Sequence, residues 1–326
     1  MWPATTFRAA LADSADPHRG AAPVVVAADW GGTWIRVAAV ADGVIVDRLR
    51  QRRPGPLPEQ YDAIAALFGR VTAGSEREPV ALGVGVAGVV QQGVVGTAAN
   101  LGITDGTDVA AALRSRLQVP TYLVNDAQAA ALGVATRWPH GLNAVVTMGT
   151  GIGGAVLLDG ALVPGLGGAG DFGHVVVDLD GPACPCGGRG CLEQLVSGRV
   201  LAEAAEALAD SAGSPLLMER RQSGRPLHAG DLQDAALAGD EAASSALASA
   251  AFAFAAGLRT IVATHDPDRI VLAGPALAES SWFGQEVRSR WTAVRPHWAR
   301  TTLVHVPDDE DAALLGAAAH VLTQSP

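Results

Sequence analysis

The chain has 326 residues and a formal net charge of -10, and all 23 of its basic residues are arginines because it contains no lysine. The acidic surplus disfavours binding to nucleic acid or to an anionic membrane, since both need clustered basic side chains. A Walker A site, a protein-kinase site and a Schiff-base enzyme are excluded because each requires a lysine. A nucleotide would therefore be held by backbone amides, hydroxyl groups and a metal ion.

The length exceeds that of a usual single core, so two domains are expected. Hydrophobic residues make up 49% and charged residues 17% of the chain, which is typical of compact α/β packing. Residues 1–22 lack a continuous apolar segment and are predicted to be a disordered leader, too short for a DNA-binding domain. No stretch reaches membrane-spanning length without interruption, so a cytoplasmic protein with no membrane partner is predicted.

The first strand is predicted over residues 24–29 and is followed by the turn Gly31-Gly32-Thr33. Glycines in such a turn let backbone N–H groups approach an anion, and Thr33 adds a hydroxyl group. Asp29 ends the strand and could hold a hydrated Mg²⁺ ion. A Gly-Gly turn alone is weak evidence for phosphate binding, because ordinary hairpins use it.

A second candidate position follows the strand predicted over residues 121–124. Asn125 and Asp126 come directly after it and open a helix that extends to about residue 135. A carboxylate at the carboxyl end of a strand is where α/β active sites collect their groups. Asn and Asp are also favoured helix caps, so a catalytic base and a capping residue both remain open for Asp126.

The pattern of the opening hairpin recurs in the second half. A strand predicted over residues 143–148 leads into a glycine-rich turn at 149–154, a strand at 155–158 and an Asp159-Gly160 turn. The repetition predicts a duplicated fold. Two such hairpins facing one another would hold a polyphosphate tail with backbone amides.

The remaining expected elements divide the chain into domains over residues 23–137 and 138–310, with the last helix packing back onto the first domain. The expected further elements are strands at 35–40, 44–49, 80–90, 269–272 and 302–306, and helices at 58–72, 108–117, 198–208, 231–237, 240–264, 282–293 and 311–322. The segment between 208 and 230 is expected to be a polar connection, and the helix at 240–264 to be a buried core helix.

All three cysteines, Cys184, Cys186 and Cys191, fall within eight positions, and His174 precedes them. One imidazole and three thiolates are a common ligand set for structural zinc. The odd number of cysteines argues against a disulfide framework. The alternative is three reduced thiols and a histidine satisfied by hydrogen bonds.

Taken together, the motifs resemble the ROK family of sugar kinases and related repressors, within the actin-like ATPase clan. The motifs that carry the resemblance are Asp29-x-Gly31-Gly32-Thr33, Asn125-Asp126-x-x-Ala129-Ala130-x-x-Gly133, Gly149-Thr150-Gly151-Ile152-Gly153-Gly154, Gly173-His174, Cys184-x-Cys186-Gly187-x-x-Gly190-Cys191-Leu192-Glu193 and Ala312-x-x-x-Gly316-Ala317-Ala318. The resemblance implies an α/β fold of the actin-like, duplicated ribonuclease H-like kind, with two domains and an active-site cleft between them.

The resemblance also implies roles for residues. Asp126 would be the catalytic base on the 6-hydroxyl of a hexopyranose, with ATP as donor. Other sugar contacts would come from Asn100, Asn125, Asp171, His174 and Glu193. Phosphate contacts would come from Asp29, Gly31, Gly32, Thr33, Gly149, Thr150, Gly151, Gly153 and Gly274. Structural Zn²⁺ on His174, Cys184, Cys186 and Cys191, Mg²⁺ with ATP, and a homodimer complete the expectation.

Four departures from the family pattern concern the sugar and the nucleotide. Asp171 stands where the family usually has glutamate, and Gly102-Ile103-Thr104 stands where it has Pro-Gly-Trp. On the nucleotide side, the family's Gly-Gly pair is replaced by Ala273-Gly274, followed by Pro275. Trp34 follows Thr33 at a position where a smaller or cationic residue is common. Glucose is the first expected substrate. Kanosamine, glucosamine and N-acetylmannosamine are alternatives.

Other function classes are less favoured. A sugar-sensing regulator would need a DNA-binding region, and a catalytically silent scaffold would not need the retained acids. Inorganic polyphosphate is disfavoured as donor because basic clusters are expected to be scarce.

Overall fold

The computed structural model describes residues 23–74, 77–96, 98, 101–103, 106–163, 165–306 and 311–324. The predicted leader at 1–22 and Asn100 lie outside the described residues. The chain forms two compact units. Unit 1 comprises Met1–Gly141, Leu157–Ala169 and Glu310–Pro326, and unit 2 comprises Leu142–Val156 and Gly170–Asp309.

Within the described ranges, two five-stranded sheets share one strand order: β3-β2-β1-β4-β8 and β11-β10-β9-β12-β13. In each sheet, the first three strands in chain order form a meander. Two further strands, parallel to the first strand, continue the sheet on the side of that strand away from the meander. The identical order confirms the predicted duplication. The strands of the first sheet are β1 (Val24–Trp30), β2 (Trp34–Ala41), β3 (Val44–Arg52), β4 (Pro79–Val86) and β8 (Thr121–Asn125). Those of the second are β9 (Leu142–Met148), β10 (Ile152–Leu158), β11 (Ala161–Leu162), β12 (Arg269–Ala273) and β13 (Thr302–Val306).

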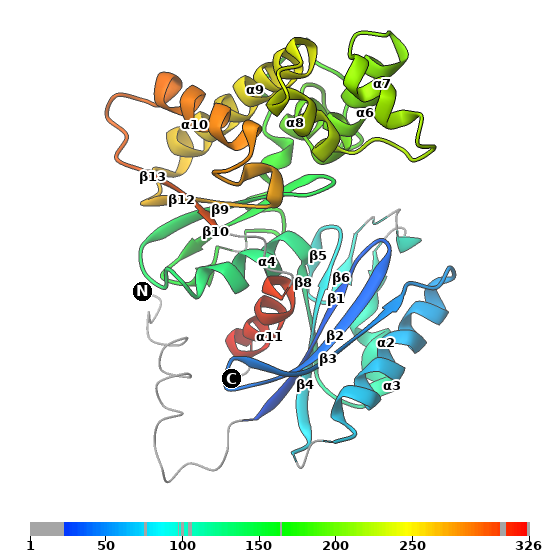
Figure 1. The fold of residues 1–326 in the computed structure, drawn as a ribbon. Coiled ribbons are helices and arrows are strands. Elements are labelled where there is room, and N and C mark those ends of the chain that lie inside the picture. Colours follow the sequence, from blue (N-terminus) through cyan, green and yellow to red (C-terminus); the bar gives the residue numbers. More distant parts are fainter. Residues whose placement is uncertain are drawn as a thin grey trace. The chain divides into compact units, whose positions relative to one another are not determined.

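Unit 1 has helices on both faces of its sheet (Figure 1). Helices α4 (Asp126–Ala135) and α11 (Ala312–Gln324) lie side by side, and α11 packs on β1 and β4. Helices α2 (Leu57–Thr72) and α3 (Val109–Leu117) pack together on the other face. Every residue of β1 is buried, including Asp29, and its other residues are apolar, as expected for a strand covered on both faces.

Three glycines let the backbones of unit 1 approach one another. A Cβ atom on Gly83 of β4 would lie 2.1 Å from the carbonyl oxygen of Ala317, and one on Gly133 of α4 would lie 2.0 Å from that of Ala312. A Cβ atom on Gly316 of α11 would lie 1.7 Å from the carbonyl oxygen of Ala129. Helix α11 is therefore fixed against both β4 and α4 by contacts that no larger residue permits.

Unit 2 is largely helical outside its sheet, and its helices share one core. Helix α9 is long and apolar enough to span a membrane, alone among the described helices, but Phe254, Leu258 and Ile261 are buried in that core. The prediction of a buried core helix is confirmed. The helices are α5 (Leu192–Leu195), α6 (Gly198–Asp210), α7 (Pro215–Arg221), α8 (Ala229–Leu237), α9 (Glu241–His265) and α10 (Trp282–Val294).

Several features differ from the sequence-based expectation. The strand predicted over residues 80–90 ends at Val86 as β4. The segment expected to be a polar connection contains α7, which begins after the cap Ser214 and buries Leu217 against the core. A small antiparallel sheet of β5 (Val90–Gln91), β6 (Val94–Val95) and β7 (Thr107–Asp108) was also not expected. Both elements are too short for their periodicity to be detected from sequence.

We predict that Gly316→Ala lowers the free energy of unfolding, although helix propensity alone would raise it by about 1 kcal/mol. The added methyl group would meet backbone rather than a movable side chain, and overpacking of this kind costs about 1–3 kcal/mol. Chemical denaturation followed by circular dichroism measures the change.

Gly69→Ala is the matched control, because Gly69 is exposed in α2 and no atom lies within 4 Å of a Cβ placed there. A Gly316→Ala protein as stable as the Gly69→Ala protein would contradict the packing account.

Candidate functional site

The carboxyl ends of three parallel strands form one edge of the unit 1 sheet. Trp30 of β1 is paired in register with Val86 of β4, which is paired with Asn125 of β8. The turn after β1 and the first turn of α4 therefore lie at the same edge. The structure thus brings Asp29 and Asp126 to the edge of the sheet where α/β proteins bind ligands.

Asn125 serves as the cap of α4. Its Oδ1 atom accepts hydrogen bonds from the amides of Ala127 at 2.9 Å and Gln128 at 3.2 Å, and its Nδ2 atom donates to the carbonyl oxygen of Gly88 at 3.1 Å. Asp126 is the first helical residue, and its Oδ1 atom accepts a 2.8 Å hydrogen bond from the Ala127 amide. The helix therefore has its cap without Asp126, which weakens the capping interpretation of that acid.

The Gly31-Gly32-Thr33 turn is held by its own hydrogen bonds. The amide of Gly31 donates to the carbonyl oxygen of Trp34 at 3.0 Å, and Arg53 donates from Nε to Gly32 at 2.7 Å and from its amide to Thr33 at 2.9 Å. The Gly31 amide is thus engaged inside the turn. Its contribution is a rigid turn beside Asp29.

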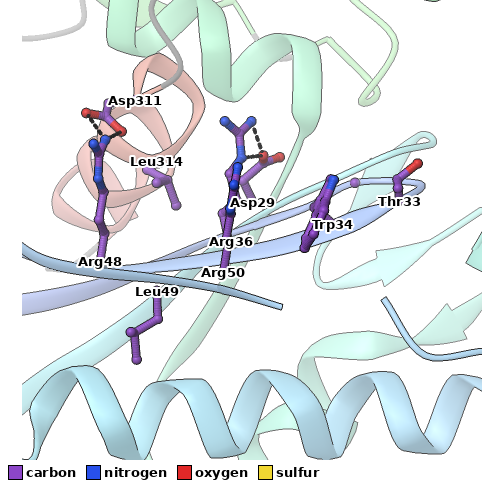
Figure 2. A pocket seen from close by; sticks show the side chains of 10 residues that line it. Asp29, Thr33, Trp34, Arg36, Arg48, Leu49, Arg50, Asp311 and Leu314 are labelled. Carbon is purple, nitrogen blue, oxygen red and sulfur yellow. Dashed lines mark hydrogen bonds and ion pairs between the residues drawn. The ribbon is translucent and has the colours of Figure 1, made fainter. Parts of the chain in front are cut away.

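A cavity of about 700 Å³ opens beside this turn (Figure 2). Its lining residues come from β1, β2, β3 and the α11 segment: Asp29, Gly31, Thr33, Trp34, Arg36, Arg48, Leu49, Arg50, Asp311 and Leu314. Two ion pairs project into it, Arg36 with Asp29 at 2.5 Å and Arg48 with Asp311 at 2.6 Å. The guanidinium of Arg50 lies 5.0 Å from the ring centroid of Trp34, a cation–π contact.

The expectation that basic clusters are scarce is therefore wrong for this part of the chain. Arg36, Arg48 and Arg50 lie on neighbouring strands and meet in one cavity. The alternation of Arg48, Arg50 and Arg52 in β3 was a usable signal, because every second residue of a strand faces the same side.

In unit 2 the candidate phosphate loop follows β9. The amide of Gly149 donates to the carbonyl oxygen of Gly151 at 3.0 Å, and the amide of Gly198 donates to that of Gly149 at 3.0 Å. Strand β10 begins at Ile152, earlier than predicted, so Gly153 lies in the strand and not in the turn. Gly274 follows β12 with φ of +127°, and a Cβ atom there would lie 2.2 Å from the carbonyl oxygen of Met148. The loop and Gly274 thus lie at the same end of the second sheet.

Glu193 joins this loop to the cysteine-rich segment. Its Oε2 atom accepts a 2.7 Å hydrogen bond from the amide of Ile152, and a Cβ atom on Gly151 would lie 2.4 Å from the same oxygen. Glu193 stands two residues after Cys191, in the first turn of α5. The conformation of the cysteine-rich segment therefore decides where this carboxylate lies.

The four predicted metal ligands lie together, with one ligand atom from each within 4.8 Å of all the others. The Nδ1 atom of His174 is 3.6 Å from the sulfur of Cys184, and the sulfurs of Cys186 and Cys191 are 3.6 Å apart. Zn–S bonds of about 2.3 Å in a tetrahedron place sulfurs about 3.8 Å apart. The geometry fits a tetrahedral zinc ion.

The surroundings of Cys191 and Cys186 shift their pKa values in opposite directions. Burial, with hydrogen bonds to Cys186 and Cys184, raises the pKa of Cys191 to about 12. A hydrogen bond from the Gly188 amide, with contacts to the other thiols, lowers the pKa of Cys186. A bound cation would allow all three to ionise, since metal coordination deprotonates thiols.

The other ring nitrogen of His174 faces Asp171. Its Nε2 atom lies 3.7 Å from Oδ2 of Asp171. Burial raises the pKa of the Asp171 carboxyl, His174 opposes this, and Glu193 adds to it. Asp171, His174 and Glu193, three predicted sugar ligands, are therefore neighbours within unit 2.

Comparison with known proteins agrees with these motifs. The model of the ROK family matches residues 25–324. The chain belongs to the ROK family. It is 32% identical over 303 residues to an N-acetylmannosamine kinase of Shigella flexneri, covering 90% of this chain and 97% of that one.

Solved structures of ROK proteins have the same fold. A ROK glucokinase from Streptomyces griseus, in complex with glucose and AMPPNP, matches with a TM-score of 0.78 and 27% identity, covering 93% of this chain and 100% of that one. A ROK hexokinase from Thermus thermophilus matches with a TM-score of 0.77 and 27% identity, covering 91% of this chain and 97% of that one. The predicted α/β fold of the actin-like class is confirmed.

Sequence reasoning missed one buried residue of this ROK chain, Gln60 of α2. Its Oε1 atom accepts from Trp30 Nε1 at 2.9 Å, and its Nε2 atom donates to the carbonyl oxygens of Gly55 at 2.8 Å and Leu101 at 3.2 Å. Gln60 thereby connects β1 to the backbone at Gly55 and Leu101. A lone glutamine in an amphipathic helix gives no sequence signal for such a role.

Proposed function

We propose that this ROK chain is a sugar kinase that transfers the γ-phosphoryl group of ATP to the 6-hydroxyl group of a hexopyranose. The observation that carries the proposal is the placing of Asp126. It stands at the carboxyl edge of β8, on the same sheet edge as Asp29, in a helix that Asn125 already caps. The names of the similar ROK proteins, an N-acetylmannosamine kinase and a glucokinase, support this reaction class.

Asp126 would act as the general base. As the 6-hydroxyl oxygen bonds to the γ-phosphorus, its proton passes to the Asp126 carboxylate and ADP leaves on the opposite side. A carboxylate suits this role because the hydroxyl group becomes acidic only as the new bond forms. The amides of Gly31 and Gly149 are bonded within their turns, so other amides of the two glycine-rich turns would stabilise the charge on the transferred group.

Asp29 and Thr33 fit a magnesium ion that arrives with ATP. Both offer oxygen atoms, the ligands that Mg²⁺ prefers, and both line the cavity of unit 1. When bound, Mg²⁺ would neutralise phosphate charge and orient the donor. The absence of lysine makes this contribution more important, since no ammonium group can replace it.

The cysteine-rich segment fits a structural zinc ion on His174, Cys184, Cys186 and Cys191. With four protein ligands, the metal would hold the segment that carries Glu193 and His174 and would not act on the substrate. His174 would use Nδ1 for the metal, leaving Nε2 on the Asp171 side for a sugar hydroxyl group.

Two sugars are favoured by specific observations. The 32% identity to an N-acetylmannosamine kinase favours N-acetylmannosamine, and the fold of the glucokinase solved with glucose favours glucose. Asp171, shorter by one methylene group than the family's glutamate, would leave room beside the sugar ring. Kanosamine and glucosamine remain alternatives, with the ammonium group facing the acids.

We predict sugar-dependent ADP formation in a coupled assay with glucose, N-acetylmannosamine, glucosamine and kanosamine at equal ATP. The highest kcat/KM is expected for N-acetylmannosamine or glucose, and it identifies the substrate. ADP formation that is independent of every sugar would contradict the proposal.

We predict that Asp126→Asn lowers kcat by about 100-fold or more, while KM for the sugar changes little, because only proton transfer is lost. Steady-state kinetics measure both constants. Asp62→Asn is the control, since Asp62 is an exposed acid of α2. Unchanged kcat in a folded Asp126→Asn protein would remove Asp126 from the mechanism.

We predict about one zinc ion per chain by elemental analysis of the purified protein, and a lower melting temperature after chelation. His174→Ala should lose the metal, whereas His297→Ala, at an exposed position outside the cluster, should keep it. A metal-free protein with an unchanged melting temperature would favour the alternative of three reduced thiols.

A cytoplasmic location and a homodimer remain predictions. Reduced, closely spaced thiols favour the first, and family membership is the ground for the second.

A further inference from the structure

We propose that two arginines outside the Asp29-x-Gly31-Gly32-Thr33 motif, Arg36 and Arg50, bind phosphate oxygens of the phosphoryl donor, and that Arg36 leaves Asp29 for one of these oxygens when the donor binds with Mg²⁺. This inference rests on the proposed function, because it assigns the donor side of the same site. The ligand chemistry is a linear chain of phosphates, from a nucleoside triphosphate or from inorganic polyphosphate.

The first argument is the row of charges across three strands. Asp29 of β1 is paired in register with Arg36 of β2, and Arg36 is paired with Arg50 of β3. Side chains in such a row point to the same face of the sheet. Two arginines directly opposite one another repel, so the arrangement costs free energy unless an anion lies near both.

The second argument is the burial of Asp29. Its side chain is 10% exposed, and Oδ2 accepts from both Nη2 and Nε of Arg36, at 2.5 and 2.7 Å. A buried carboxylate needs a cation beside it. If Mg²⁺ replaces Arg36 beside the Asp29 carboxylate, the Arg36 guanidinium becomes available for the phosphate oxygens of the donor. The Asp29 carboxylate is then paired with Mg²⁺, and the Arg36 guanidinium with phosphate.

The third argument is the charge balance of the lining. Among the lining residues that the structure describes, three arginines, Arg36, Arg48 and Arg50, accompany two aspartates, Asp29 and Asp311. The partner of Arg50 among the described contacts is the Trp34 ring, which leaves its positive charge without a carboxylate. The cavity of about 700 Å³ lies within the usual range for small-molecule sites.

The main alternative is structural. Arginines on an edge strand can prevent association of sheets, and Asp29 and Arg36 could be a fixed ion pair. Edge protection does not require the arginines to share a cavity with the turn predicted to bind phosphate. Figure 2 shows Arg36 and Arg48 projecting to the α11 side, whereas Leu49 points to the opposite face.

The test measures donor binding without sugar by titration calorimetry, using MgATP and magnesium tripolyphosphate as separate probes. The proteins are the wild type, Arg36→Ala, Arg50→Ala and the control Arg70→Ala, an exposed arginine of α2. We expect Kd to rise about 10- to 100-fold in Arg36→Ala and in Arg50→Ala, since each loses a charge-assisted contact, and to stay unchanged in the control.

The two arms identify the source of the phosphate chain. Tight binding of MgATP with weak binding of tripolyphosphate assigns the site to a nucleotide, and comparable binding of both assigns it to any phosphate chain. Arg50→Ala leaves the Asp29–Arg36 pair intact, so donor binding can still be tested with this variant if Arg36→Ala does not fold. A fixed ion pair predicts instead that Arg36→Ala binds MgATP as well as, or more tightly than, the wild type.

Kd values within about twofold of the wild type for both probes in Arg50→Ala, and in Arg36→Ala where it folds, overturn the inference. This outcome is distinguishable from failure of the proposed function. A wild type that forms ADP from ATP and sugar while these variants bind normally retains the kinase function and loses only the arginine site.

Discussion

The candidate site groups of both units are positioned by one constraint. At several glycines the backbone packs directly against another backbone segment and leaves no room for a Cβ atom. In unit 1, Gly133 and Gly316 bring α4 and α11 into contact, which sets the start of α4 where Asp126 lies. In unit 2, Gly198 lies against the carbonyl oxygen of Gly149, and Gly274 against that of Met148. Groups at the strand ends are thus positioned by the fold itself.

The second constraint is that the chain must balance its acidic side chains without lysine. Arginine is the only strongly basic residue of this chain, so guanidinium groups are its only strong side-chain cations. Asp29 is buried and paired with Arg36 in the same row of the sheet, and Glu193 accepts a backbone amide beside the second glycine turn. Each acid is held in place by a partner before any ligand is considered.

Much of this could be predicted from the sequence, because it depends on local patterns. The duplicated hairpins and the cysteine cluster are visible as spacing, and the strand order and the grouping of His174 with three sulfurs agree with them. For Asp126, a capping role could not be separated from a catalytic role without the geometry, which has Asn125 as the cap of α4. The arginine cavity and Gln60 were missed because they depend on cross-strand register and tertiary contacts.

The central claim is phosphoryl transfer to a sugar hydroxyl group, and ³¹P NMR tests it most directly. With MgATP and the preferred hexose, the account predicts that the γ-phosphate signal is replaced by a phosphomonoester coupled to both C6 protons of the sugar. Conversion of the γ-phosphate to inorganic phosphate alone, or a monoester on another carbon, would contradict it.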